Sequence, residues 1–346
     1  MNKKLYLLAT VAIFAACSSN DVKNDIMETN NEIGFDALTY KTTRAEITSN
    51  ANLASEGGFV VWGYKAKNQT TMDWTVDKYT VFNGVNVTSS TGAYISGNET
   101  NWTYTSKKYW DKNASYCFYA VAPYGGSYSI AGATNNVMRI TITGAASGDA
   151  SAAGTKDYLI SRAGVIDRKG TDQSNVDFTF NHVMAKVDFL LKKAATVTGE
   201  VKVQSIAMTG WDGGNGTFVQ TLTASPNNEL SHTEWTIPSH NTSASATVLS
   251  SETAALGTDG AKNGTNTFIM VPQTIAADAL TFTIDFTVDN EPFKAQVGHV
   301  TTQQVWGTDS HITYTLTIAP AAIEFDVASI AGFSNEGTGA ATIPVQ

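Results

Sequence analysis

Two positions near the start of the chain have surroundings that suit a covalent reaction on the chain itself. The first is Cys17, which follows a segment with the features of a secretory signal: Lys3 and Lys4 are positive and the stretch from Leu5 to Ala16 is apolar. That stretch is too short to span a bilayer as a stable helix. We predict cleavage before Cys17 and its diacylation, palmitate included, since two or three acyl chains anchor far better than one. The alternative is an ordinary signal peptide that happens to contain a cysteine.

The second position is the peptide bond between Arg44 and Ala45, where a lone arginine follows a β-favouring segment. In that segment Ile33, Phe35 and Ala37 alternate, and threonines and a tyrosine follow, which predicts a strand. Cleavage after Arg44 would remove this strand as one piece and leave the folded body one strand short. The alternative is that the arginine lies in an exposed loop that is never cut.

The sequence offers no cluster of titratable side chains with the spacing of an active site. Its five histidines are scattered and lack metal-ligand spacing; they are His182, His232, His240, His299 and His311. We expect His182, flanked by phenylalanines, to be a hydrogen-bonded core or edge residue, and Cys117, in an apolar run, to be a buried small side chain. We therefore predict that the protein is not an enzyme and has no catalytic, cofactor-binding or metal-binding residues.

The composition favours an exported, mostly β protein. The 346 residues leave room for two domains. Apolar residues make up 42%, which excludes a disordered chain, while only 15% are charged and no long stretch keeps helical periodicity. The net charge of −9 argues against nucleic acid as a partner, because phosphates would repel it.

Short apolar or alternating segments, separated by glycine and asparagine turns, recur along the chain as they do in β-sandwiches. In the first half they lie at residues 58–64, 79–82, 102–104, 116–122, 137–143 and 157–161. In the second half they lie at residues 176–191, 201–208, 268–273, 280–288, 293–297 and 312–318. The run at 58–64 is dense enough for a strand buried on both faces. A polar stretch near residue 170 predicts a domain boundary, although a linker and a long hairpin loop look alike in sequence.

The C-terminal segment mirrors the strand before Arg44. Two alternating groups lie in it, namely Ile323, Phe325 and Val327, then Ala341, Ile343 and Val345. Such a strand can fold back on its own domain or enter another subunit.

Taken in order, these motifs resemble the fimbrillin-like family of Bacteroidia, whose members include type V pilins. The matching motifs are the lipoprotein cysteine, Ile33-Gly-Phe35 before Thr43-Arg44, Trp102-Thr-Tyr104 with Tyr109-Trp110, the run from Tyr116 to Pro123, Asp157-Tyr-Leu159, the run from Phe180 to Val187, Val271-Pro-Gln273, and Trp306-Gly with His311-Ile-Thr-Tyr314. The resemblance spans nearly the whole chain. One departure is Ile330-Ala-Gly-Phe333, where many relatives carry a tryptophan.

The resemblance implies an all-β fold of two tandem transthyretin-like, Greek-key β-sandwich domains. The expected parts are a signal peptide at 1–16, a tether with a removable first strand at 17–44, sandwiches at 45–172 and 173–322, and a candidate donor strand at 323–346.

It also implies a pilin, the structural subunit of a cell-surface fimbrium that contributes to adhesion. A lipidated precursor would reach the outer membrane, an arginine-specific protease would remove the first strand, and a C-terminal strand of a neighbouring subunit would fill the groove. The expected partners are other fimbrial subunits, as a homopolymer or with accessory pilins, and a host or bacterial surface ligand.

Two alternatives stay open. One is a monomeric outer-membrane lipoprotein that binds glycans through aromatic loops, with Trp74, Trp102, Trp211 and Trp235 as a stacking surface, although such residues are more often core plugs. The other is a tip or anchor component of a fimbrium that does not polymerise.

Overall fold

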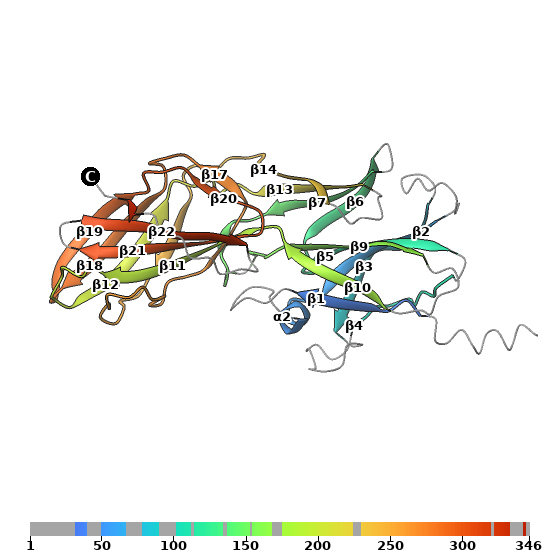
Figure 1. The fold of residues 1–346 in the computed structure, drawn as a ribbon, viewed down its shortest axis with the longest axis horizontal. Coiled ribbons are helices and arrows are strands. Elements are labelled where there is room, and N and C mark those ends of the chain that lie inside the picture. The colour runs from blue at the N-terminus through green and yellow to red at the C-terminus, as the bar shows by residue number, and fades with distance from the viewer. Residues whose placement is uncertain are drawn as a thin grey trace, which may run out of the picture.

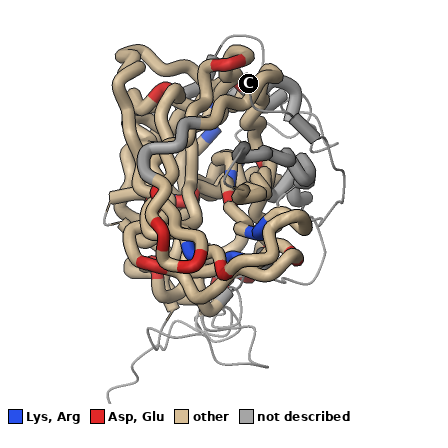
Figure 2. Tube along the Cα trace, turned by 90° about the vertical axis from the view of Figure 1, so that its left-hand side faces the viewer, with Lys and Arg blue, Asp and Glu red and all other residues tan. Residues whose placement is uncertain are grey.

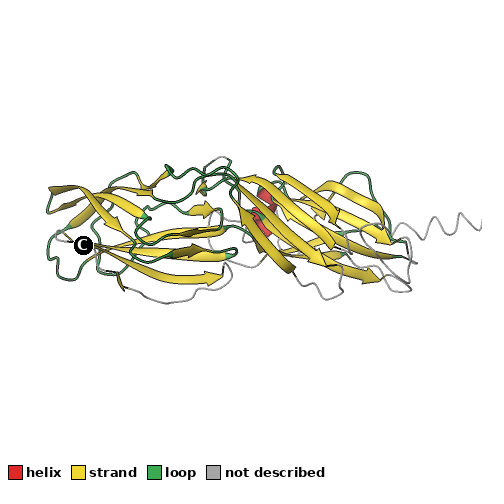
Figure 3. Cartoon of the chain, turned by 90° about the horizontal axis from the view of Figure 1, so that it is seen from above, coloured by secondary structure: helices red, strands yellow, loops and turns green. Residues whose placement is uncertain are grey.

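The structure, a computed structural model, describes residues 32–39, 50–66, 78–89, 102–111, 114–133, 137–152, 154–167, 175–223, 230–319, 322–332 and 342–343. Within these residues strands dominate, and the one helix is the short α2 (Asn50–Ser55). The strands form two lobes that lie end to end (Figure 1), with α2 near the place where the lobes meet (Figure 3). The predicted all-β class is confirmed. No helix in this described part is both long and apolar enough to cross a membrane.

The first lobe is built on a seven-stranded sheet that curls until its two ends meet. The order is β1-β10-β9-β5-β2-β3-β4. These strands are β1 (Phe35–Thr39), β2 (Phe59–Ala66), β3 (Lys78–Ser89), β4 (Trp102–Thr103), β5 (Ser115–Ala122), β9 (Leu159–Asp167) and β10 (Val176–His182). At the closure, the Ile33 N–H donates to the Lys108 carbonyl oxygen at 2.8 Å, and Glu32 forms a β-bridge with Tyr109.

Strands β2 and β5 are buried on both faces, because each face of the sheet packs on its own core. Every residue of β5 is buried, and so is every residue of β2 except the half-buried Lys65. The core inside the curl is rich in aromatic rings, among them Phe35, Phe59, Phe82, Phe118, Phe178 and Phe180. Gly63 is required on this face, because a β-carbon there would lie 2.7 Å from the Phe82 ring and 2.8 Å from the Phe118 ring. The prediction of a doubly buried strand at 58–64 is confirmed.

The other face of β2, β5 and β9 is covered by a four-stranded sheet, β14-β13-β7-β6, whose strands come from both halves of the chain. These strands are β6 (Ser127–Ala133), β7 (Val137–Ala145), β13 (Gly216–Thr223) and β14 (Leu230–Thr236). β7 pairs antiparallel with β13, so that Ile142 lies opposite Phe218. The buried side chains of this region, here called the shared core, are Val60, Trp62, Tyr64, Ala66, Cys117, Tyr119, Val121, Ile140, Ile142, Ala145, Tyr158, Ile160, Val183, Met184, Phe218, Ile269 and Val271.

The second lobe packs a six-stranded sheet, β23-β22-β21-β11-β16-β8, on a four-stranded sheet, β15-β12-β18-β19. Its strands are β8 (Gly148–Asp149), β11 (Ala185–Lys193), β12 (Val201–Thr209), β15 (Ser245–Leu249), β16 (Phe268–Met270), β18 (Thr281–Val288), β19 (Glu291–His299), β21 (Ser310–Ala319), β22 (Ala322–Gly332) and β23 (Thr342–Ile343), with β17 (Gln273–Ile275) and β20 (Gln304–Trp306) as a separate pair. In its core the Trp306 indole N–H donates to the Tyr314 hydroxyl at 3.0 Å, so the buried indole is satisfied.

Strand β10 leads almost directly into β11 and so links the two lobes. The two intervening residues, Val183 and Met184, are both buried in the shared core. The polar stretch near residue 170 connects β9 to β10, which pair antiparallel within the first lobe. Strand pairing does not test which parts fold independently, so the domain limits 45–172 and 173–322 stay a prediction.

Asp188, on β11, is a largely buried carboxylate that is surrounded by basic side chains. Figure 2 shows how acidic and basic residues are distributed along the chain. His311 Nε2 lies 2.9 Å from Oδ2, Lys262 Nζ lies 2.9 Å from Oδ1, and Lys186 Nζ lies 3.4 Å from Oδ2. The Thr267 hydroxyl donates to Oδ1 at 2.6 Å. Burial alone would raise the pKa of Asp188, but the contacts with His311, Lys186, Thr267 and Lys262 outweigh it and hold that pKa well below its usual range.

We expect Asp188→Asn to lower the free energy of unfolding near neutral pH by about 1.5–3 kcal/mol, the contribution of hydrogen bonds to a charged group. Because the pKa of Asp188 is lower in the folded than in the unfolded chain, this contribution is complete above the unfolded pKa of about 3.9 and is lost as the pH falls below it. Urea unfolding at a series of pH values should show the wild type and the variant converging in acid. A difference that stays constant below about pH 4 would contradict this account.

Candidate functional site

Strand β1, which the sequence singled out, closes the curled sheet of the first lobe. It pairs parallel with β10, so that Phe35 lies opposite Val176 and Ala37 lies opposite Phe178. The Val176 N–H donates to the Gly34 carbonyl oxygen at 2.9 Å. Backbone hydrogen bonds therefore hold β1 and the residues before it to β10 on one side. On the other side, the Ile33 N–H bonds to the carbonyl oxygen of Lys108, which follows β4.

The alternating side chains of this segment all enter the aromatic core. Ile33, Phe35 and Ala37 are 0%, 1% and 2% exposed. The Phe35 ring stacks on Phe178 with centroids 5.7 Å apart and meets Phe82 edge-on at 5.3 Å. It also contacts the rings of Phe59, Tyr104 and Phe118. Burial of the two larger side chains contributes roughly 1.5–3 kcal/mol each.

Polar contacts fix the start of the strand. The Tyr104 hydroxyl donates to the Ile33 carbonyl oxygen at 2.8 Å, and burial raises the pKa of Tyr104 to about 12, so the hydroxyl keeps its proton near neutral pH. Asn175 Nδ2 donates to Asp36 Oδ2 at 3.0 Å. A β-carbon at Gly34 would lie 2.0 Å from Asn175 Oδ1. A strand in this position therefore needs glycine there, or Asn175 must move.

The predicted modification sites, Cys17, Arg44 and Ala45, lie outside the described residues. Ten residues, 40–49, separate β1 from α2, and the Arg44 peptide bond lies in this interval. Lipidation and cleavage stay predictions.

The predicted C-terminal strands extend the six-stranded sheet of the second lobe. Ile323, Phe325 and Val327 lie on β22, which pairs with β21 at nine positions. Ile343 lies on β23, which pairs with β22 at only two positions. Ala341, Val345 and the side chains of both strands lie outside the described part of the structure. Strand β22 is thus an inner strand of its own lobe, whereas β23 is a short strand at the edge.

Most of the chain matches a known protein family. Residues 43–332 match the family described as Fimbrillin-like. The chain belongs to the fimbrillin-like family. The resemblance seen in the ordered sequence motifs is therefore confirmed over most of the chain's length.

Individual relatives of this fimbrillin-like chain are more distant. It is 25% identical over 202 residues to "Fimbrium subunit Fim1C" of Phocaeicola vulgatus, a match that covers 53% of this chain and 49% of the relative, so the chain spans about half of that protein's length. Among solved structures it is similar to a fimbrial protein from Bacteroides vulgatus, with a TM-score of 0.53 and 16% identity over 88% of this chain and 100% of that one. At this identity the structural similarity shows the fold alone.

Three of the four tryptophans considered as a sugar-stacking surface pack within the fimbrillin-like fold. Trp211 is buried, Trp102 packs against the aromatic core, and Trp235 packs against the shared core with its indole N–H donating to the Val183 carbonyl oxygen at 2.8 Å. Trp74 lies outside the described residues. The interpretation of these residues as core plugs is supported for the three that are described.

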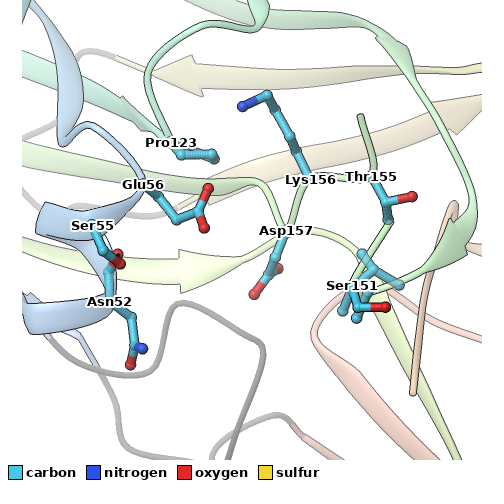
Figure 4. A pocket seen from close by; sticks show the side chains of 10 residues that line it. Asn52, Ser55, Glu56, Pro123, Ser151, Thr155, Lys156 and Asp157 are labelled. Carbon is cyan, nitrogen blue, oxygen red and sulfur yellow. Dashed lines mark hydrogen bonds between the residues drawn. The ribbon is translucent and has the colours of Figure 1, made fainter. Parts of the chain in front are cut away.

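Two of the remaining candidates for chemistry, a histidine and a cysteine, are buried. His182 is buried with Nδ1 3.0 Å from Asp157 Oδ1, as expected for a hydrogen-bonded core histidine, and Cys117 is buried, as expected, and is not part of a disulfide. In the described part of the chain, no three His, Cys, Asp or Glu side chains are grouped so that they could hold a metal ion. The sequence reasoning named Asp157 only as part of a family motif and missed the cavity that it lines (Figure 4), because the lining residues come from segments that lie far apart in the chain.

Proposed function

We propose that this fimbrillin-like protein is a structural subunit of a cell-surface fimbrium, assembled by exchange of one strand between subunits. The observation that carries the proposal is β1, an apolar strand whose side chains complete the core of the first lobe and which is followed by the Arg44 peptide bond. Loss of β1 would uncover Phe178, Tyr104 and their neighbours and would free the backbone of β10. A strand from another subunit with the same alternation of apolar side chains would cover these core residues again and would pair with the backbone of β10.

Strand addition suits this groove because backbone hydrogen bonds supply affinity while alternating side chains supply specificity. Before cleavage β1 pairs the edge of β10, which is a common protection against premature association. Cleavage after export would therefore act as the trigger. In full, the proposal includes a lipidated precursor at the outer membrane, an arginine-specific protease, and two transthyretin-like sandwiches.

The pairing of the C-terminal strands favours residues from 341 onward as the donor. Donation of β22 would break nine paired positions with β21, whereas donation of β23 would break two with β22. Burial of Ile343 and Val345 in the next subunit would contribute roughly 1.5–3 kcal/mol each, and each new ladder hydrogen bond would add about 1 kcal/mol net. The ordering of the tail would offset part of this gain.

Limited proteolysis of the mature protein tests the trigger. We expect trypsin to yield a product that begins at Ala45, and we expect SDS-resistant ladders to appear only after the cut. Arg44→Ala should keep β1 and stay monomeric with an arginine-specific protease, and the double variant Lys41→Ala, Arg44→Ala should do the same with trypsin, which also cuts after lysine. Arg44→Lys should be cut by trypsin alone, which separates the need for the cut from the need for arginine.

Arg139→Lys, at an exposed position of β7, is the matched control and should assemble like the wild type. A cleanly cut product that remains monomeric would overturn strand exchange and would favour a tip component or a monomeric lipoprotein. Equal polymerisation of uncut Arg44→Ala would remove the role of the arginine.

A further inference from the structure

The segment that closes the first lobe has an inward and an outward face, and the outward face carries a second source of specificity. Its apolar side chains point into the aromatic core, so Gly34 and Asp36, which alternate with them, face outward and are half-buried. Asn175, the residue before β10, lies beside both. Selection of a strand through this face rests on the proposed function, because it acts only if the groove beside β10 is emptied and refilled.

Asn175 holds Asp36 and leaves no room for a side chain at position 34. Its Nδ2 donates to Asp36 Oδ2 at 3.0 Å. A β-carbon at Gly34 would lie 2.0 Å from Asn175 Oδ1, and the three atoms nearest to that β-carbon all belong to the Asn175 carboxamide. The φ of Gly34 lies outside the left-handed region, so its backbone does not itself require glycine. The need for glycine therefore comes from Asn175.

A strand with a side chain at this position fits only if the Asn175 carboxamide turns away. That turn breaks the hydrogen bond with the residue in the place of Asp36, because the same carboxamide makes it. Hydrogen bonds to carboxylates are among the stronger ones in proteins, so the loss is measurable. Two strands with the same inward side chains therefore differ in affinity for the groove if only one has glycine in the place of Gly34.

Two other segments of the chain have an alternation that suits the aromatic core but lack this glycine. β22 contains Ile323-Glu-Phe-Asp326, which matches Ile33-Gly-Phe-Asp36 except that a glutamate replaces the glycine. In the C-terminal tail, Thr342 precedes Ile343 as glycine precedes Phe35. Either segment would bring a side chain against Asn175 if its central apolar residue took the place of the phenylalanine.

We propose that Asn175 selects the strand that fills the groove, because it accepts glycine before the central apolar residue and disfavours a side chain there. The tail of a neighbouring subunit then displaces β1 less readily than its apolar residues alone would allow, which adds to the protection that the covalent link to β1 gives. Cleavage removes that link, so that β1 is diluted away and the tail enters. The same contact disfavours insertion of the β22 segment in its place.

Urea unfolding of the uncut full-length chain tests the contact without any strand exchange. We expect Gly34→Ala to lower the folding equilibrium constant about tenfold, equivalent to about 1.4 kcal/mol. In the Asn175→Ala background the same change should cost nothing or give a small gain, because alanine loses less conformational freedom than glycine in a strand. In the background of Thr179→Ala, an exposed change on β10, the loss should persist.

Peptide binding to the cut chain tests selection itself. Labelled peptides with the sequence of residues 32–40, with and without the change Gly34→Thr, are added to the chain cut after Arg44, and fluorescence anisotropy measures their affinity. We expect the wild-type protein to bind the glycine peptide about tenfold more tightly than the threonine peptide. Asn175→Ala should bind both with affinities within about twofold of each other.

The comparison of the two peptides on the wild-type protein needs no variant of the protein, so it carries the test if Asn175→Ala does not fold. Selection by Asn175 is overturned, while strand exchange stands, if Gly34→Ala costs the same in both backgrounds or if the cut wild-type protein binds the two peptides equally. If the cut wild-type protein binds neither peptide, strand exchange is overturned and selection with it.

Discussion

Phe35→Ala is expected to lower the free energy of unfolding of the uncut chain by about 3–5 kcal/mol, the usual range for removal of a buried phenylalanine ring. The ring is 1% exposed and is surrounded by five other aromatic rings, so that the surrounding residues cannot close the space without moving several of them. Urea unfolding of full-length wild type and variant measures the difference.

Thr179→Ala is the control for this measurement, because Thr179 lies on the exposed face of β10, the strand that pairs with β1. We expect it to change stability by no more than about 0.5 kcal/mol. A loss below about 1 kcal/mol for Phe35→Ala would mean that β1 adds little to the first lobe. The groove left by its removal would then have little affinity for a replacement strand.

Phe218→Ala is also expected to lower the free energy of unfolding by about 3–5 kcal/mol. Unlike Phe35→Ala, it should destabilise both lobes. Phe218 is fully buried in the shared core, and its ring lies 5.1 Å from that of Trp235. It comes from the second half of the chain yet packs in a core with Trp62 and Tyr119 of the first half. Hydrogen exchange should therefore accelerate in β5 and in β11 alike, by roughly a hundredfold or more where exchange requires global unfolding.

Thr236→Ala, an exposed change at the end of β14 in the same hairpin, should leave exchange in both strands unchanged. If Phe218→Ala accelerated exchange only within β13 and β14, the hairpin would be a local cover and not part of a common core.

The strands of the first lobe were largely predictable, because the order of apolar and polar residues within each short segment indicates which side chains are buried. The continuous apolar runs at 58–64 and 116–122 correspond to β2 and β5, and the alternation of Ile33, Phe35 and Ala37 marks the side chains that enter the aromatic core. A strand with one buried face alternates apolar and polar residues, whereas a strand with two buried faces is apolar along its whole length.

Features that depend on distant residues were not predictable in this way. Helix α2 has only six residues, too few to show a helical period. The hairpin β13–β14 is rich in polar residues, and Phe218 gains its burial from β7 and from the first-lobe sheet. A polar stretch such as the one near residue 170 is typical both of a linker between domains and of a loop between paired strands, and here it connects β9 to β10, which pair. The cavity beside Asp157 has no spacing signal at all, because folding alone assembles its wall.

The shared core also bears on how the molecule would respond to mechanical load. Bending between the lobes would pull β13 and β14 away from the sheet that they cover and expose Phe218, Met184 and their neighbours to water. With no long linker between β10 and β11, the chain has little slack at the junction to act as a hinge. The filament that we propose would therefore bend mainly at the joints between subunits, and, if subunits exchange a strand as proposed, its stiffness would depend on that strand more than on the subunit itself.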